Sequence, residues 1–378
     1  MAVTSNIVLT FNESIQRGSG TIYLRSGSAT GTVIESYDAA TSSRLTISNS
    51  TVTIDPTNNL SNSTNYYVTF ASGTTLAVSG SMSLIAGTVW TSTAAITFNA
   101  TTTGKTITTN GTTLAGSITF NGVGGGWTLG SALTIGPTQI TTLTAGALDL
   151  GGFNLQTGLF NSTGTGVRSV AFGSNFIILA TTNTGGTNIG MANATNFSCT
   201  GTGGFSAAAD ITRIYTLGTT GAPTVAPNLT FTGSGTAIQT LTTGSYFGTL
   251  NFGSTSFNPG TTTLNLYALT LSSGGTFSTL TPTMVGTGTI TTNGNTTLAS
   301  LIINSVNGTT TLGDAFSTVA TGTTTLTSGT LDLGGFNLTT GIFASTNSNT
   351  RSISFGSNNI VMAHTTAGTT VLSMANAT

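Results

Sequence analysis

Hydrophobic and polar residues alternate in short runs along the whole chain. Runs such as GTIYLRS at 20–26, STVTIDP at 50–56 and GSITF at 116–120 place apolar side chains at every second position. A period of two predicts β-strands with one buried face. Gly and Asn separate the runs and supply turns that need a positive φ. No long segment has the 3.6-residue period of an amphipathic helix. We therefore predict an all-β protein.

The first part of the chain is predicted to be a β-sandwich. Its short strands are separated by turn residues, a spacing typical of sandwiches. Charged residues are frequent up to Asp55 and become sparse beyond about residue 90. We place a domain boundary near Ser92–Ala95 and predict a sandwich over residues 1–93. The expected strands are NIVLTF at 6–11, GTIYLRS at 20–26, TVIESYD at 32–38, RLTIS at 44–48, STVTIDP at 50–56 and NYYVTFAS at 65–72.

Residues 94–378 are predicted to form a parallel β-solenoid. Strand-like runs such as KTITT at 105–109, NLQTG at 154–158 and NFIILA at 175–180 are short and closely punctuated by Gly. Stacked coils of about 20–30 residues would accommodate them. A string of β-sandwich domains, each of roughly 90–100 residues, is the alternative. We favour the solenoid because the strands are so short, although no period of coil length is visible in the sequence.

A long duplication supports a repetitive architecture. Residues 142–195 and 325–378 match without a gap and at one constant offset, since 332 − 149 for the Asp pair and 351 − 168 for the Arg pair both equal 183. A weaker match extends the equivalent segments to 104–195 and 287–378. This 183-residue super-repeat would span roughly seven to nine coils. We expect it to continue beyond Thr378 with a sequence close to NFSCTGTGGF, which follows the first copy.

The composition narrows the possible partners. Only 4% of the 378 residues are charged, and the seven Lys and Arg form no cluster, which disfavours nucleic acid. No apolar stretch approaches the ~20 residues of a membrane span. The hydrophobic content of 37% still allows a packed core, unlike that of a disordered chain. We expect neither nucleic-acid binding nor membrane insertion.

Four repeated charged residues are the candidate surface or assembly contacts. Asp149 and Asp332 could bind a partner or Ca²⁺, but a turn beside the Gly pair of LDLGG explains them better. Arg168 and Arg351 could contact an anionic glycan or a neighbouring subunit, or could be solvated or Asp-paired. Because charge is rare in this region, these positions are the first to test for assembly contacts.

We find no group of residues in the sequence that is arranged for catalysis, metal binding or cofactor binding. His364 and Cys199 each lack sequence-evident partners. Glycoside hydrolysis needs two carboxylates at a defined separation, and the solenoid region offers only four, two of which are repeat equivalents. Recurring Phe residues are interpreted as core stacks between coils, with a sugar platform as the alternative. The four carboxylates are Asp149, Asp210, Asp314 and Asp332, and the Phe pairs are Phe153 and Phe336, Phe160 and Phe343, and Phe172 and Phe355.

Two resemblances accompany these patterns. SNIVLTFNESIQRGSGTIYLRS at 5–26 and STVTIDPTNNLSNSTNYYVTFASG at 50–73, with a late Trp90, resemble the bacterial Ig-like domain of S-layer proteins and large adhesins. That family implies a structural or spacer module without catalytic residues. The repeats, such as LTSGTLDLGGFNLTTGIFASTNSNTRSISFGSNNIVMA at 326–363, resemble those of fibre and structural proteins of marine phages, cyanophages especially, and of related environmental bacterial proteins.

Three functions remain open at this point. The first is a non-enzymatic fibre protein on the outside of a phage virion. It would contact copies of itself, with a trimer as the favoured state, other tail or capsid proteins, and a host receptor or surface glycan. The N-terminal MAVTSNIVLTF lacks the features of a Sec signal peptide, as expected of a virion protein. The second is a bacterial adhesin or S-layer-like protein at the cell surface. The third is a polysaccharide depolymerase whose catalytic part lies beyond Thr378.

Overall fold

The chain folds as two compact units, Met1–Thr181 and Thr182–Thr378. The computed structural model describes residues 6–10, 15–71, 75–208, 210–221, 223, 225–232, 239–252, 262–271, 273, 277, 279–295 and 298–375. Over these residues every regular element is a β-strand, as the alternating pattern predicts. No helix long and apolar enough to cross a bilayer occurs in this part of the chain.

An antiparallel sandwich occupies the N-terminal part of the first unit. Its strands form two sheets, one in the order β1-β5-β4 and the other in the order β3-β2-β6. Each of the six predicted runs contains one of these strands. The strands are β1 (Ile7–Thr10), β2 (Thr21–Ser26), β3 (Thr32–Asp38), β4 (Leu45–Ser48), β5 (Thr51–Ile54) and β6 (Tyr66–Phe70).

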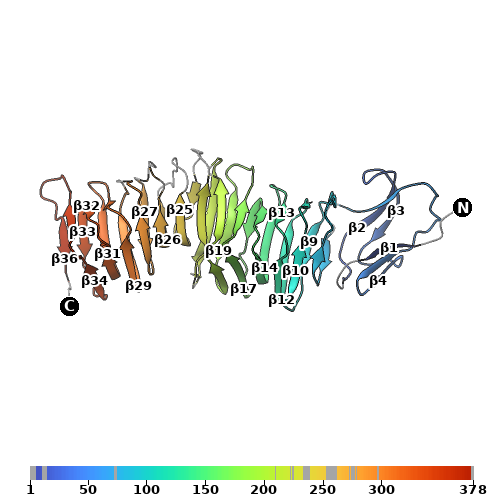
Figure 1. Cartoon of the computed structure of the whole chain (residues 1–378), viewed down its shortest axis with the longest axis horizontal. Helices are drawn as coiled ribbons and strands as arrows, with labels where there is room; N and C mark the ends of the chain where they lie inside the picture. Colours follow the sequence, from blue (N-terminus) through green and yellow to red (C-terminus); the bar gives the residue numbers. More distant parts are fainter. Residues whose placement is uncertain are drawn as a thin grey trace. The chain divides into compact units, whose positions relative to one another are not determined.

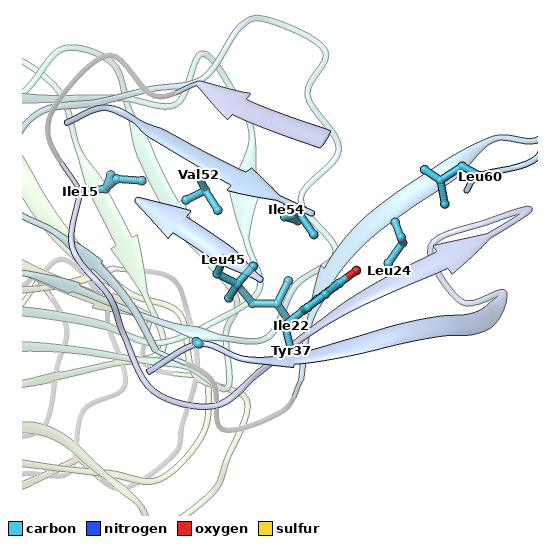
Figure 2. Packing of buried hydrophobic residues seen from close by; sticks show 9 residues of the cluster. Ile15, Ile22, Leu24, Tyr37, Leu45, Val52, Ile54 and Leu60 are labelled. Carbon is cyan, nitrogen blue, oxygen red and sulfur yellow. The ribbon is translucent and has the colours of Figure 1, made fainter. Parts of the chain in front are cut away.

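The sandwich is held by apolar side chains that alternate along these strands. In β2, Ile22 and Leu24 are 7% and 0% exposed, whereas the residues between and beside them are half-buried. Figure 2 shows Ile22, Tyr37 and Leu45 directed into the same space between the strands. Each fully buried aliphatic side chain contributes roughly 1.5–3 kcal/mol relative to an exposed one. The strand alternation in the sequence therefore produces the core directly.

From about residue 75 onward the strands pair in parallel and form a β-solenoid, with about 12 turns in the described residues. The first of them, β7, bridges the sandwich at Ile15↔Val78 in antiparallel fashion and pairs in parallel with β9 on its other edge. Parallel pairing thus begins ahead of the boundary expected near Ser92–Ala95, because one strand serves both folds. The solenoid strands of the first unit are β7 (Thr75–Val78), β8 (Met82–Ser83), β9 (Ala95–Phe98), β10 (Lys105–Thr108), β11 (Thr113–Leu114), β12 (Ile118–Leu129), β13 (Leu133–Ile135), β14 (Ile140–Asp149), β15 (Leu155–Thr157), β16 (Leu159–Asn161), β17 (Arg168–Gly173) and β18 (Phe176–Leu179).

Residues 95–179, all of them described, form three parallel ladders. The first half of β12 pairs with β9 and the second half with β10, and a register shift between Asn121 and Gly126 separates the halves. The third ladder runs through β11, β13, β15 and β18. Figure 1 shows β10, β12 and β14 following one another along the unit. In the third ladder Leu133 is the partner of Leu155, so this coil lies within the expected length of about 20–30 residues.

Identical positions of successive coils stack inside the solenoid. Leu133, Leu155 and Ile177 are partners in one ladder, and each is 0% exposed. Phe98 and Phe120 stack in another ladder with ring centroids 5.3 Å apart. Strands of neighbouring coils lie about 4.8 Å apart, so like side chains meet in van der Waals contact. These stacks are the core of the first unit's solenoid.

The second unit repeats this construction. Its long strands β29 and β31 begin and end at the repeat equivalents of the first and last residues of β12 and β14, so the duplication is structural as well as sequential. The strands are β19 (Thr187–Asn193), β20 (Phe197–Gly201), β21 (Gly204–Ala208), β22 (Arg213–Thr220), β23 (Asn228–Thr232), β24 (Gln239–Leu241), β25 (Tyr246–Phe252), β26 (Thr262–Thr270), β27 (Leu280–Met284), β28 (Gly288–Thr291), β29 (Leu301–Leu312), β30 (Phe316–Ser317), β31 (Thr323–Asp332), β32 (Leu338–Thr340), β33 (Ile342–Ser345), β34 (Arg351–Ser354), β35 (Ile360–Met362) and β36 (Leu372–Met374).

Candidate functional sites in the repeated coils

Asp149 and Asp332 end the long strands β14 and β31 and stabilise the turns that follow. Asp149 Oδ1 accepts a hydrogen bond from the Gly151 N–H at 2.9 Å, and Asp332 Oδ1 accepts one from Gly334 at 3.0 Å. Gly151 and Gly334 both have a φ of 59°, a left-handed conformation that favours glycine. LDLGG is therefore a turn motif in both copies. Asp149 is exposed and Asp332 half-buried, and a role of either in assembly stays a prediction.

The structure contradicts the expectation that Arg168 is a surface contact. Its side chain is 1% exposed and lies inside the first unit. Nε donates to Ser162 Oγ at 2.7 Å, Nη2 donates to the Ser162 carbonyl at 3.0 Å, and Nη1 donates to the Gly166 carbonyl at 2.9 Å. Burial lowers the pKa of the guanidinium. Several oxygens thus solvate a buried charge and fix the loop before β17.

Arg351 occupies the same ladder position with different surroundings. It aligns with Gly329 in the ladder as Arg168 aligns with Gly146. The side chain is half-buried, and Nη1 donates to Asn347 Oδ1 at 2.7 Å. Asn347 stands where the first copy has Gly164, which offers no side-chain acceptor. Arg351 also lines a groove of about 270 Å³ beside Asn307 and Thr330, and its role in assembly stays a prediction.

The serine that holds Arg168 was not recognised in the sequence. Ser162 Oγ donates to the Leu143 carbonyl at 2.8 Å, and its repeat equivalent Ser345 donates to the Leu326 carbonyl at 3.1 Å. Both serines tie the end of one strand to the coil before it. The only sequence signal was their recurrence at the offset of the super-repeat. In a Ser-rich chain that recurrence has little discriminating power.

Asp314 also has a structural role, since its carboxylate binds backbone groups of the preceding coil. Asp314 accepts hydrogen bonds from the N–H groups of Thr292 and Asn293. In the first copy Ser131 Oγ accepts from the equivalent Thr109 and Asn110 at 2.8 and 3.1 Å. A carboxylate and a hydroxyl thus perform the same task.

Asp210 forms an ion pair of 2.6 Å with Arg213, which is 2% exposed and also donates to the Ala208 carbonyl. Sequence reasoning did not single out Arg213. Each of the four solenoid carboxylates therefore accepts a local structural hydrogen bond.

His364 and Cys199 have ordinary surroundings. His364 is half-buried, and its Nδ1 accepts from the Thr366 N–H at 3.1 Å. Cys199 is 6% exposed, lies 3.4 Å from the Val225 carbonyl oxygen, and has its pKa raised to about 12 by burial. A thiol in that state is a poor nucleophile at neutral pH. Within the described residues no three His, Cys, Asp or Glu side chains gather as metal ligands would.

The recurring Phe residues divide into two groups. Phe160, Phe172 and Phe343 are each 1% exposed, as predicted for core stacks. Phe153 and Phe336, which follow the Gly pairs of the LDLGG turns, are 39% and 38% exposed, and Phe355 is 45% exposed. The core interpretation is wrong for Phe153 and Phe336. Among the described residues β34, which Phe355 follows, pairs with β31 alone, so stacking of Phe355 between coils stays a prediction. At Phe153 and Phe336 the reason is that a residue after two left-handed glycines lies outside the alternation of the strand.

Comparisons with known proteins assign one part of the chain. No curated protein and no solved structure matches it. The antiparallel sheets β1-β5-β4 and β3-β2-β6, with their shared core, precede the first parallel coil. Residues 1–94 match the family model of the bacterial Ig-like domain, and this part of the chain is therefore a bacterial Ig-like domain.

Proposed function

We propose that the chain is a non-enzymatic structural fibre protein of a phage virion. An Ig-like domain joined to a β-solenoid suggests a protein of the surface or fibre type. In this proposal the Ig-like domain attaches to the capsid or tail, and the solenoid is the shaft that projects toward the host surface. The chain would accordingly lie on the outside of the virion.

The observation that carries the proposal is the structural use of the repeated polar residues. Asp149 and Asp332 hold turns, and Arg168 holds a loop. A duplication that retains these residues also retains the hydrogen bonds that hold each coil together. Each coil of a solenoid contacts its neighbours, so coils can be added or lost without redesign of the rest. That property suits a shaft whose length is set by the number of coils, and it gives no reason to expect catalysis.

Partners follow from the same proposal. Copies of this chain, as a trimer, and other tail or capsid proteins are the expected contacts, with a receptor or glycan of the host at the far end. The repeated charged residues proposed for such contacts are Asp149, Asp332 and Arg351. We propose no nucleic-acid partner, no membrane insertion and no cofactor.

A bacterial adhesin or S-layer-like protein is the second candidate. The match to a bacterial Ig-like domain supports it, because cell-surface proteins carry this module as well. A depolymerase with its catalytic part outside this chain is the third candidate. A reducing-sugar assay of the full-length protein on polysaccharide addresses that possibility.

Density-gradient fractionation of an infected culture separates the first two proposals. An antibody against residues 1–94 is used on every fraction. A fibre protein co-sediments with nuclease-protected DNA and the major capsid protein. Recovery with bacterial envelopes alone, in infected and uninfected cultures equally, would refute the virion proposal and favour the adhesin. The genes beside this one are a second check, since capsid and portal genes accompany a virion protein.

A further inference from the structure

A cleft of about 320 Å³ lies within the first unit, beside the Ig-like sheet β3-β2-β6. Arg25 of β2 and Thr69 of β6 line one side of it, and Trp90 lies in the segment 89–93 that lines the other. A volume of this size is at the lower end of the range for small-ligand sites. Of the described lining residues only Arg25 is charged, so the cleft is cationic.

The guanidinium of Arg25 is held in a fixed orientation. Nε donates to Thr69 Oγ1 at 3.0 Å, and Nη1 donates to the Gly31 carbonyl at 2.8 Å. The guanidinium carbon also lies 5.1 Å from the centre of the Tyr23 ring. Nη2 donates to no group in the part of the chain that the structure describes. One face of a preorganised donor is thus available to an anion, at little further cost in side-chain entropy.

Trp90 supplies an apolar surface. Its side chain is half-buried, and its Nε1–H donates to the Ser92 carbonyl at 3.0 Å. Because the polar group of the indole is already satisfied inside the chain, the ring is what remains for a ligand. Hydroxyls of Thr30, Thr69 and Thr91 complete the lining and can both donate and accept hydrogen bonds.

We propose that this cleft binds a uronic acid residue of an acidic polysaccharide. The carboxylate of the sugar accepts a hydrogen bond from Arg25 Nη2, the apolar face of the pyranose ring packs on Trp90, and sugar hydroxyls meet the threonines. One fixed cation, one aromatic ring and neutral hydroxyls are the groups that such a sugar needs. The proposal holds equally for a virion protein and for a cell-surface protein, so it does not rest on the proposed function.

The test is titration of the whole chain with tetragalacturonate, with its methyl ester as the neutral control. Tryptophan fluorescence reports on the cleft, because Trp127 is 1% exposed and Trp90 is the accessible indole of the two. We expect saturable binding of the acid at millimolar concentration, weaker binding in high salt, and at least about tenfold weaker binding of the ester.

Substitutions in the cleft test which side chains bind the sugar. Arg25→Gln removes the cation and should lower the affinity about tenfold or more, whereas Arg44→Gln, at an exposed arginine outside the cleft, should leave it unchanged. Trp90→Ala, followed by calorimetry, should give a comparable loss and keeps the proposal testable if the Arg25 variant does not fold. Equal binding of acid and ester, equal or tighter binding of tetraglutamate, or no saturable binding would each overturn the proposal.

Discussion

Arg168 Nε donates to Ser162 Oγ at 2.7 Å inside the first unit, and Nη2 of the same guanidinium reaches the Ser162 carbonyl at 3.0 Å. Ser162 in turn donates to the Leu143 carbonyl of the preceding coil at 2.8 Å. A buried charge is thereby connected to the hydrogen bonds between coils. The residue that looked most like a binding site in the sequence is a structural part of the solenoid.

Arg168→Ala should destabilise the protein strongly. The change removes hydrogen bonds from a charged group and leaves the buried Ser162 carbonyl and the partly buried Gly166 carbonyl without these donors, which lowers the free energy of unfolding by about 2–4 kcal/mol. The control is Arg44→Ala, at an arginine whose side chain is 42% exposed and pairs with Asp55 at 3.1 Å, where we expect about 1 kcal/mol or less. The midpoint of guanidinium unfolding followed by circular dichroism measures both. Equal losses for the two variants would contradict the account.

Gly146→Ala should be more costly than Gly152→Ala. Gly146 has a φ of 95°, and a Cβ added there would lie 2.6 Å from the Gly122 carbonyl oxygen of the neighbouring coil. Gly152 has a φ of 88° with no atom within 4 Å of an added Cβ. The control therefore carries only the conformational cost, roughly 1–2 kcal/mol, and Gly146→Ala adds a steric clash to it. Thermal unfolding ranks the two, and the reverse order would refute the close packing of coils.

Asp149→Asn should be nearly neutral, and Asp149→Ala should cost about 0.5–1.5 kcal/mol. The turn needs an acceptor for the Gly151 N–H, and an amide oxygen supplies one as well as a carboxylate does. Calcium or a chelator should leave the melting temperature of the parent protein unchanged. If Asn proves as harmful as Ala, or if calcium stabilises the fold, the carboxylate charge has a role that the turn does not explain.

Cys199 should resist alkylation in the folded protein. Burial raises the pKa of its thiol from its usual 9.0 to about 12, so the reactive thiolate is scarce at neutral pH. Because the folded state disfavours the thiolate, the stability associated with the neutral thiol is fully present below the unfolded pKa of 9.0 and is lost as the pH rises toward about 12. Iodoacetamide labelling read by mass spectrometry should succeed only after denaturation. Rapid labelling of the native chain would disprove the burial.

Local features were predictable from the sequence. Alternation indicated the strands of the Ig-like domain, and the LDLGG turn at Asp149 could be read from neighbouring residues alone. The length of the coils could not be predicted from the sequence, because the number of residues between ladder partners varies from coil to coil. The residue numbers of the partners differ by 22 at Leu133↔Leu155, by 18 at Leu264↔Pro282 and by 26 at Tyr215↔Leu241.

Burial of charge was the other feature that the sequence did not reveal. Arg168 and Arg351 have the same local sequence signals, and Arg168 is 1% exposed. Scarcity of charge suggested a surface role for both. The acceptors of Arg168 belong to a loop whose path depends on the coil before it, and no local pattern encodes that path.

Immunogold electron microscopy of purified phage particles tests the central proposal most directly. One antibody is raised against residues 1–94 and a second against residues 287–375. We predict that both label the particles, with the label for the Ig-like domain closer to the capsid or tail and the solenoid label farther out. Gold along bacterial envelopes, with none on the particles, would contradict the assignment of this chain to a virion.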